Sequence, residues 1–261
     1  MGTHKKPVTK PVTCIFVHGW AMNSGVWEAS LSHLPDWIRP ISIDLPGHGT
    51  MAAVNANSID DYVQAIIPLT HQPVLWVGWS LGAQVVIRLA ELYPERVSAL
   101  FLVAANPCFV QRADWPTAVS ADTLKAFAGG LANHQAKTLQ RFLNLQVKGL
   151  ANARQRVRQL QEAMAVRGPA SAAALHAGLQ ILRDNDYRHC LRQLSCPVSW
   201  FLGGQDTLVP IAVEKAIQRL YPSHTVYVAA GAGHIPFVSH VSQFVTALVA
   251  QASSLRVNES R

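Results

Sequence analysis

The pentapeptide Gly78-Trp79-Ser80-Leu81-Gly82 is the feature that most restricts how this chain can fold. The apolar run Val74 to Val77 precedes it, and apolar residues recur at helical intervals after it until Pro94. Glycines on both sides of a serine at this spacing suit a turn at which strand and helix pass so closely that a Cβ would clash. The pattern therefore predicts a strand, a strained turn and a helix, with Ser80 on the turn as a nucleophile.

A serine hydroxyl is a weak nucleophile at neutral pH, so it needs a base, and the base needs an acid that fixes its tautomer. Two later segments can supply them. Asp206 lies in a glycine-containing turn after the apolar run Val198 to Leu202, and His234 lies in a glycine-containing loop after Val226 to Ala230. We interpret His234 as the general base and Asp206 as the acid that orients it.

Asp184 and Asp186 are the alternatives for the orienting acid. Both lie near the end of a helical stretch, where a capping or solvated role is the simpler interpretation, so we favour Asp206. The order serine, aspartate, histidine along the chain is that of the α/β-hydrolase arrangement, and it differs from the orders in chymotrypsin and subtilisin.

The oxyanion that forms when a serine attacks an ester needs N–H donors that already point at it. Leu81, which follows the nucleophile, is the first expected donor. Trp20 is the second, because the segment His18-Gly19-Trp20 follows an apolar strand-like run and has the character of an oxyanion loop. His18 itself is expected to be a structural hydrogen-bonding residue.

Strand and helix patterns alternate up to about Ala105, and no further strand pattern occurs until Val198. This organisation predicts an α/β-hydrolase fold with a mostly parallel central sheet flanked by helices and a helical cap insertion. The expected parts are a first core segment, a cap, a second core segment and a tail, at residues 1–110, 111–186, 187–252 and 253–261.

The composition excludes several other classes of protein. No stretch reaches the roughly 20 apolar residues of a membrane span, and residues 1–10 contain no apolar signal core. The four cysteines lack metal-binding spacing, and no nucleotide-binding glycine loop or zinc motif occurs. We therefore expect a monomeric cytoplasmic protein with reduced cysteines, no cofactor and no metal.

Positive charge is concentrated in the predicted cap. Residues 125–167 contain eight basic side chains and one acidic side chain, Glu162, so this stretch alone accounts for the formal net charge of +7. A solvated helix surface is one interpretation, and a docking surface for an acidic partner is the other. Nucleic acid would satisfy the charge, but aromatic residues do not interleave with the basic ones, which favours an acidic protein that carries the substrate.

Several segments outside the serine motif carry a resemblance to a known family. They are His18-Gly-Trp20, Asn106-Pro-Cys-Phe109 followed by Asp114-Trp-Pro116, Arg141-Phe-Leu-Asn-Leu-Gln146, and Gly178-Leu-Gln-Ile-Leu182. With these segments the chain resembles the pimeloyl-acyl-carrier-protein methyl ester esterases of biotin synthesis, the BioH family, over nearly its whole length.

The resemblance implies that Ser80 attacks the methyl ester of a pimeloyl chain held on acyl carrier protein. It also implies a substrate site formed by Trp20, Ser80 and Leu81 together with Phe142, Leu143, Asn144, Leu145 and Gln146. Contacts with the carrier protein would fall on Lys137, Arg141, Arg154 and Arg158. Lysine at position 137 departs from the arginine of the family, and a lysine cannot form a bidentate pair with phosphate or carboxylate.

Two other functions remain possible at this stage. The first is a broad-specificity short-chain carboxylesterase of the same fold, in which the basic surface is incidental. The second is a non-catalytic ligand-binding protein that keeps the cleft. The intact serine, histidine and aspartate argue against the second.

Overall fold

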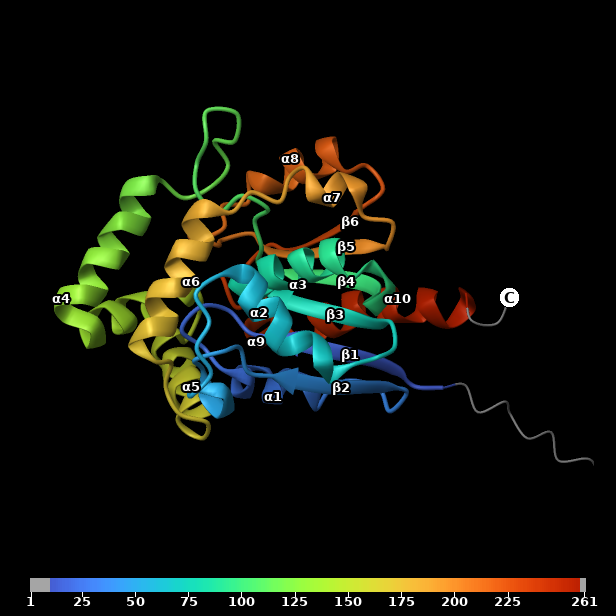
Figure 1. Ribbon diagram of the computed structural model, residues 1–261, viewed down its shortest axis with the longest axis horizontal. Coiled ribbons are helices and arrows are strands. Elements are labelled where there is room, and N and C mark those ends of the chain that lie inside the picture. The colour runs from blue at the N-terminus through green and yellow to red at the C-terminus, as the bar shows by residue number, and fades with distance from the viewer. Residues whose placement is uncertain (1–9, 259–261) are drawn as a thin grey trace, which may run out of the picture.

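The structure, a computed structural model that describes residues 10–258, contains one six-stranded sheet in which all neighbouring strands are parallel (Figure 1). The strand order is β2-β1-β3-β4-β5-β6. The strands are β1 (Val12–Val17), β2 (Ile38–Ile43), β3 (Val74–Trp79), β4 (Val97–Val103), β5 (Val198–Gly203) and β6 (Thr225–Ala229). Every residue of β3 and β5 is buried, because helices cover both faces of the sheet.

Helices form layers on both sides of this sheet and confirm the predicted architecture (Figure 1). Helices α2 and α3 pack together on one face, while α9 and α10 pack together on the other. The helices outside the cap are α1 (Glu28–Leu31), α2 (Ile59–Ile66), α3 (Leu81–Leu92), α7 (Cys190–Gln193), α8 (Val213–Leu220), α9 (Pro236–Ser239) and α10 (Val241–Asn258). Short 3-10 turns occur at Ser24–Trp27, Gly49–Met51, Ile67–Leu69 and Pro94–Arg96.

The first three of the four helices between β4 and β5 in the chain lie together at one side of the sheet (Figure 1). They are α4 (Ala121–Gln146), α5 (Ala153–Ala165) and α6 (Ala172–Asp184), and we refer to them as the cap. Helix α4 packs against both α5 and α6 and bends at His134, whose φ of −147° and ψ of 57° are not helical. All three helices lie within residues 111–186, the range expected for the cap.

The serine motif forms the predicted strand, turn and helix. Ser80 connects β3 to α3 with a φ of 55° and a ψ of −114°, a conformation rare for a residue with a side chain. A Cβ on Gly82 would lie 2.5 Å from the carbonyl oxygen of His18, and one on Gly78 would lie 2.6 Å from Cα of Ala83. Both glycines are therefore required by close backbone approach.

The C-terminal boundary of the fold differs from the sequence prediction. We expected a tail from residue 253, whereas α10 continues to Asn258. Leu255 packs against the core, and the guanidinium of Arg256 lies 4.7 Å from the centre of the Trp37 ring. The helix thus contacts the core beyond the expected end, and residues 259–261 of the expected tail lie outside the described residues.

A buried polar cluster joins the loop after β1 to the loop after β2. Nε2 of His18 accepts a hydrogen bond of 2.9 Å from the backbone N–H of Leu45. Asp44 accepts hydrogen bonds from the N–H groups of Ser24 and Thr50 at 2.6 and 2.8 Å. His18 and His48 are fully buried with ring centres 5.0 Å apart. This geometry gives His18 the structural role that we expected from the sequence.

We predict that acidification destabilises the fold through this cluster. Burial, with a smaller contribution from His48, lowers the pKa of His18 from 6.5 to about 3. At any pH between the folded and the unfolded pKa of His18, the unfolded chain binds more protons than the folded chain. The free energy of unfolding therefore falls as the pH falls below 6.5. The free energy of unfolding should decrease by up to about 1.4 kcal/mol per pH unit for this residue, as measured by urea denaturation from pH 7.5 to 4.5.

The variant His18→Gln removes this titration and serves as the control. Its free energy of unfolding should depend less steeply on pH than that of the wild-type protein. Equal slopes in the two proteins would contradict the assignment of the pH dependence to His18.

Candidate active site

Ser80, His234 and Asp206 form one hydrogen-bonded row at the carboxyl ends of β3, β5 and β6. Oγ of Ser80 lies 2.9 Å from Nε2 of His234, and Nδ1 of His234 lies 2.7 Å from Oδ2 of Asp206. All three side chains are almost completely buried. With the proton of the neutral ring on Nδ1, the imidazole donates to Asp206 and accepts the hydroxyl proton of Ser80.

Backbone donors hold the carboxylate of Asp206 in place. Its Oδ1 accepts hydrogen bonds from the N–H groups of Leu208 and Val209 at 2.8 and 2.9 Å, which leaves Oδ2 for the imidazole. The two alternative acids are engaged elsewhere, because Asp184 pairs with Arg183 and Asp186 pairs with Arg188. The structure therefore brings Asp206, and neither alternative, to His234.

Two contacts that the sequence analysis missed hold the loop of His234. The indole N–H of Trp79 donates to the carbonyl oxygen of His234 at 2.8 Å. The N–H of His234 donates to the carbonyl oxygen of Gln146, at the end of α4, at 3.1 Å. Trp79 lies inside the serine motif, directly before Ser80. This position was the one sequence signal that could have indicated its contact with the His234 loop. The Gln146 contact uses only the backbone and has no signature in the sequence.

The predicted oxyanion residues lie beside the serine. A Cβ on Gly19 would lie 3.3 Å from Cβ of Ser80, so the loop that carries Trp20 passes directly beside Ser80. The N–H of Ser80 itself donates to the carbonyl oxygen of Val103. Leu81 is the first residue of α3, where backbone N–H groups have no partner within the helix. The indole of Trp20 is held by a 2.8 Å hydrogen bond to the carbonyl oxygen of Leu175 in α6.

An apolar cavity of about 20 Å³ lies between this row and the cap. Its walls combine core and cap residues, namely Trp20, Ser80, Phe109, Val119, Thr123, Leu124, Phe127, Phe142, Leu179, Leu182, Leu208 and His234. Phe142 packs edge-on against Trp20 with ring centres 4.6 Å apart. Its apolar walls suit contact with an apolar group next to Ser80.

The predicted substrate segment 142–146 is only partly in this wall. Phe142 lines the cavity, whereas Leu143, Asn144, Leu145 and Gln146 are not among its lining residues within the described part of the chain. Asn144 is exposed, the side chain of Gln146 is fully buried, and it is the backbone carbonyl oxygen of Gln146 that accepts the hydrogen bond from the N–H of His234. The structure therefore brings Phe142 alone of these five side chains to the cavity.

The four cationic residues expected to meet a partner are all exposed on the cap, on α4 and α5. They are Lys137, Arg141, Arg154 and Arg158. Arg158 forms an ion pair of 2.7 Å with Glu162. The guanidinium of Arg141 lies 5.7 Å from the ring centre of Phe127, which is a wall of the cavity.

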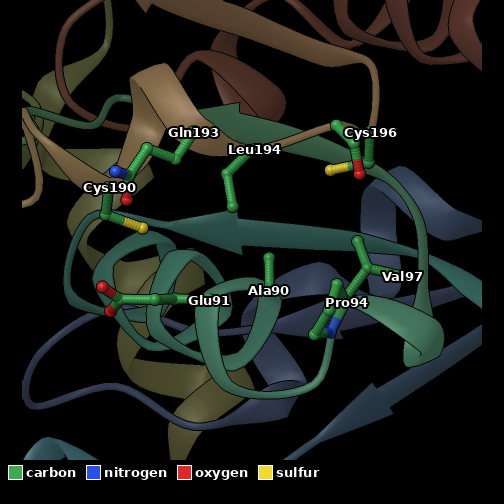
Figure 2. A pocket seen from close by; sticks show the side chains of 9 residues that line it. Ala90, Glu91, Pro94, Val97, Cys190, Gln193, Leu194 and Cys196 are labelled. Atoms are coloured by element: carbon green, nitrogen blue, oxygen red, sulfur yellow. The ribbon is translucent and has the colours of Figure 1, made fainter.

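A second pocket, of about 240 Å³, lies between α3 and α7, with Cys190 and Cys196 at opposite ends (Figure 2). Burial raises the pKa of the Cys190 thiol to about 12 and that of the Cys196 thiol to about 11. Both thiols therefore stay protonated at neutral pH and are poor nucleophiles. This pocket offers no chemistry comparable to that of Ser80.

The described part of the chain, residues 10–258, lacks a metal-binding cluster and a membrane-spanning helix. Within that range, no group of three or more histidine, cysteine or acidic side chains is arranged to hold a metal ion. The helices of the same range are all too short or too polar to cross a membrane.

Comparison with known proteins identifies the family. Residues 13–241 match the model of the alpha/beta hydrolase fold family. A pimeloyl-[acyl-carrier protein] methyl ester esterase of Nitrosomonas europaea is 39% identical over 89% of this chain and 92% of its own length. The protein of the same name from Edwardsiella ictaluri is 36% identical over 90% of each chain.

Solved structures agree with this fold. A bromoperoxidase from Bacillus anthracis superimposes with a TM-score of 0.83, at 22% identity over 94% of this chain and 92% of its own. The esterase EaEST from Exiguobacterium antarcticum gives a TM-score of 0.82, at 20% identity over 94% of this chain and 93% of its own. Because the sequence relatives are closer and span nearly the whole chain, this protein belongs to the pimeloyl-[acyl-carrier protein] methyl ester esterase family of α/β hydrolases and is a serine hydrolase.

Proposed function

We propose that this enzyme hydrolyses the methyl ester of pimeloyl-acyl-carrier protein to pimeloyl-acyl-carrier protein and methanol in biotin synthesis. The observation that carries the proposal is the hydrogen-bonded row of Ser80, His234 and Asp206 beneath an apolar cavity, in a chain 39% identical to a protein named for this activity. The enzyme would act in the cytoplasm as a monomer.

In the first half of the reaction, Oγ of Ser80 attacks the carbonyl carbon of the methyl ester while Nε2 of His234 takes the hydroxyl proton. Asp206 stabilises the imidazolium that forms. The tetrahedral intermediate then collapses, and the imidazolium gives its proton to the departing methoxide. Methanol leaves, and the pimeloyl group remains bound to Ser80 as an ester.

In the second half, a water molecule attacks the acyl-enzyme with His234 again acting as the base. Collapse of this second intermediate releases the free carboxylate of pimeloyl-acyl-carrier protein and restores the hydroxyl of Ser80. The backbone N–H groups of Trp20 and Leu81 are the donors that we assign to the oxyanion in both halves, since preorganised donors are most effective in a buried site.

The apolar cavity explains why a methyl ester suits this site. A methyl ester hides a carboxylate charge that would be costly to bury, while each methylene that leaves water contributes about 0.8 kcal/mol. The volume of about 20 Å³ is far too small for a seven-carbon chain. We therefore infer that the cap moves away from the core to admit the substrate, with α4, which carries Phe127 and Phe142, as the element that opens the cavity.

The basic cap surface supplies the site for the carrier protein. Lys137 and Arg141 are exposed there on α4, which borders the cavity, and Arg154 and Arg158 are exposed on α5, which packs against α4. Attraction between this surface and an acidic carrier would speed encounter and would weaken as ionic strength rises. Arg158 has the weakest case among the four, because Glu162 already pairs with it.

The small cavity favours one alternative, an esterase for short acyl groups. Purified protein should therefore be assayed with pimeloyl-carrier methyl ester and with free dimethyl pimelate, following loss of the methyl group by mass spectrometry. Our proposal predicts a higher kcat/KM for the carrier-linked ester, with an advantage that shrinks at high salt. If the protein hydrolyses free dimethyl pimelate but not the carrier-linked ester, it is the short-chain esterase.

We predict that Ser80→Ala reduces kcat for ester hydrolysis by at least about 10⁴-fold, because no nucleophile remains. The melting temperature should stay close to that of the wild type, since the backbone turn is retained. Methanol release by steady-state kinetics checks the first expectation, and circular dichroism checks the second. A variant that keeps most of its activity would remove Ser80 from the mechanism.

We predict that the double substitution Lys137→Glu with Arg154→Glu raises KM for the carrier-linked ester by about tenfold. The KM for a small neutral ester should not change, because both residues lie outside the cavity wall. A matched control is Arg39→Glu with Lys215→Glu, which reverses two exposed charges on β2 and α8. Equal effects of the two double variants on the carrier-linked ester would count against docking at the cap.

A further inference from the structure

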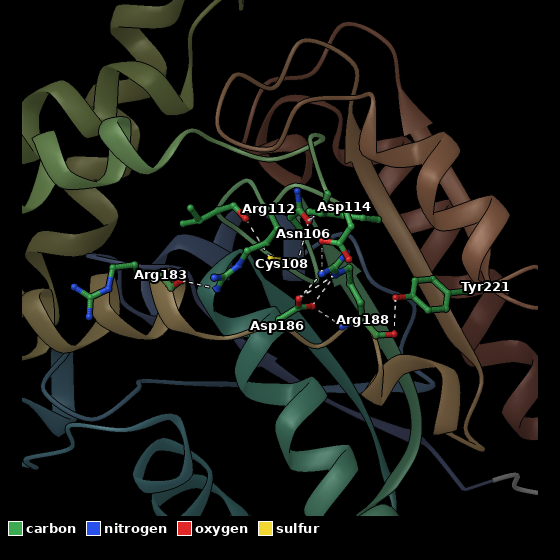
Figure 3. A network of polar contacts seen from close by, with 10 residues as sticks. Asn106, Cys108, Arg112, Asp114, Arg183, Asp186, Arg188 and Tyr221 are labelled. Carbon is green, nitrogen blue, oxygen red and sulfur yellow. Dashed lines mark hydrogen bonds and ion pairs between the residues drawn. The ribbon is translucent and has the colours of Figure 1, made fainter.

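A cluster of polar contacts ties together the segment that leaves β4 for the cap and the segment that returns from it (Figure 3). We propose that Asn106, Trp115 and Arg188 in this cluster are positioning residues that hold one wall of the acyl cavity and so set the preference for acyl-chain length. The inference rests on the proposed ester hydrolysis at Ser80 and names residues that determine its specificity.

The wall in question consists of Phe109 and Val119, which both line the cavity above Ser80. The two residues are bound to each other, because the N–H of Val119 donates to the carbonyl oxygen of Phe109 at 3.2 Å. The N–H of Gln111 donates in turn to the carbonyl oxygen of Val119 at 2.9 Å. Phe109 and Val119 therefore form one unit whose position depends on the loop between them.

The amide of Asn106 closes that loop from inside. Its Oδ1 accepts hydrogen bonds from the indole N–H of Trp115 at 2.9 Å and from the N–H of Cys108 at 3.2 Å. Its Nδ2 donates to the carbonyl oxygen of Thr117 at 2.7 Å. Asn106 and Trp115 are almost completely buried, so a lost bond could not be replaced by water at low cost.

Arg188 holds the loop from outside. Its guanidinium lies 5.3 Å from the centre of the Trp115 ring, and it bonds to Asp114 at 2.9 Å and to Asp186 at 2.6 Å. Asp114 precedes Trp115 in the loop, whereas Asp186 belongs to the returning segment with Arg188 (Figure 3). The two carboxylates fix the flat guanidinium over the indole, which is an arrangement that arginine makes and lysine does not.

The cluster is anchored to the core at two points and to the last turn of α6 at one, where the guanidinium of Arg112 donates to the carbonyl oxygen of Arg183 at 3.3 Å (Figure 3). The hydroxyl of Tyr221, at the end of α8, donates to the carbonyl oxygen of Arg188 at 2.9 Å. The N–H of Tyr187 donates to the carbonyl oxygen of Pro107 at 2.8 Å. The Phe109 and Val119 wall is thus tied to the core, while Phe127 and Phe142, which also line the cavity, belong to α4. A fixed wall of this kind limits how far an acyl chain can extend from Ser80.

The test compares Arg188→Met with the wild-type protein on p-nitrophenyl esters of two to eight carbons, which need no carrier protein. Release of the wall should raise KM for the hexanoate by about tenfold and leave kcat for the acetate within about twofold. Trp115→Phe keeps a ring under Arg188 but removes the donor to Asn106. It should likewise raise KM for the hexanoate and leave kcat for the acetate nearly unchanged. Arg188→Lys, which keeps the charge, should recover part of the hexanoate preference.

Arg183→Met is the matched control, because Arg183 forms an exposed ion pair with Asp184 and its side chain points away from the cluster (Figure 3). This variant should leave kcat/KM unchanged for both the acetate and the hexanoate. A lower melting temperature with an unchanged ratio of hexanoate to acetate kcat/KM would show a purely structural role and overturn the inference. If Arg188→Met does not fold, Trp115→Phe decides by the same ratio. Wild-type turnover of these esters without turnover of the carrier-linked ester would reject the proposed substrate alone, and turnover of neither would overturn both.

Discussion

The position of the His234 imidazole, with one nitrogen on Ser80 and the other on Asp206, is the constraint on which the rest of the structure depends. The two hydrogen bonds, at 2.9 and 2.7 Å, join residues up to 154 positions apart. A parallel sheet makes this possible because the carboxyl ends of its strands meet at one edge. The loop of His234 is fixed by a buried hydrogen bond from the indole of Trp79. The carboxylate of Asp206 is fixed by buried hydrogen bonds from the backbone N–H groups of Leu208 and Val209.

The cavity above this row combines two parts with different attachments. Phe109 and Val119 are held by a cluster bound to the core, whereas Phe127 and Phe142 lie on the bent helix α4. The carbonyl oxygen of Gln146, at the end of the same helix, binds the N–H of His234. One backbone hydrogen bond thus links α4 to the loop of His234, so the movement of α4 that we propose for substrate entry would also shift this loop.

Local steric rules made much of this predictable from the sequence. The glycines around Ser80 identify the turn because a Cβ at either position would collide with backbone, and Asp206 and His234 each follow a recognisable buried strand. Contacts between distant segments were not predictable. Arg188 and Asp114 are 74 residues apart, the Gln146 contact involves only backbone atoms, and Arg256 in the last turn of α10 contacts Trp37 from a distant part of the chain. Segment 142–146 was expected to line the substrate site as a whole, but a helix turns only some of its side chains to one surface.

The central claim is that His234 activates the hydroxyl of Ser80. Labelling with a fluorophosphonate tests it most directly, because the reagent reacts with an activated serine and the modified peptide can be located by mass spectrometry. The account predicts one phosphonyl group per chain, on Ser80, at a rate that falls by several orders of magnitude in folded His234→Gln. Labelling of another residue, or equally fast labelling of Ser80 in that variant, would contradict it.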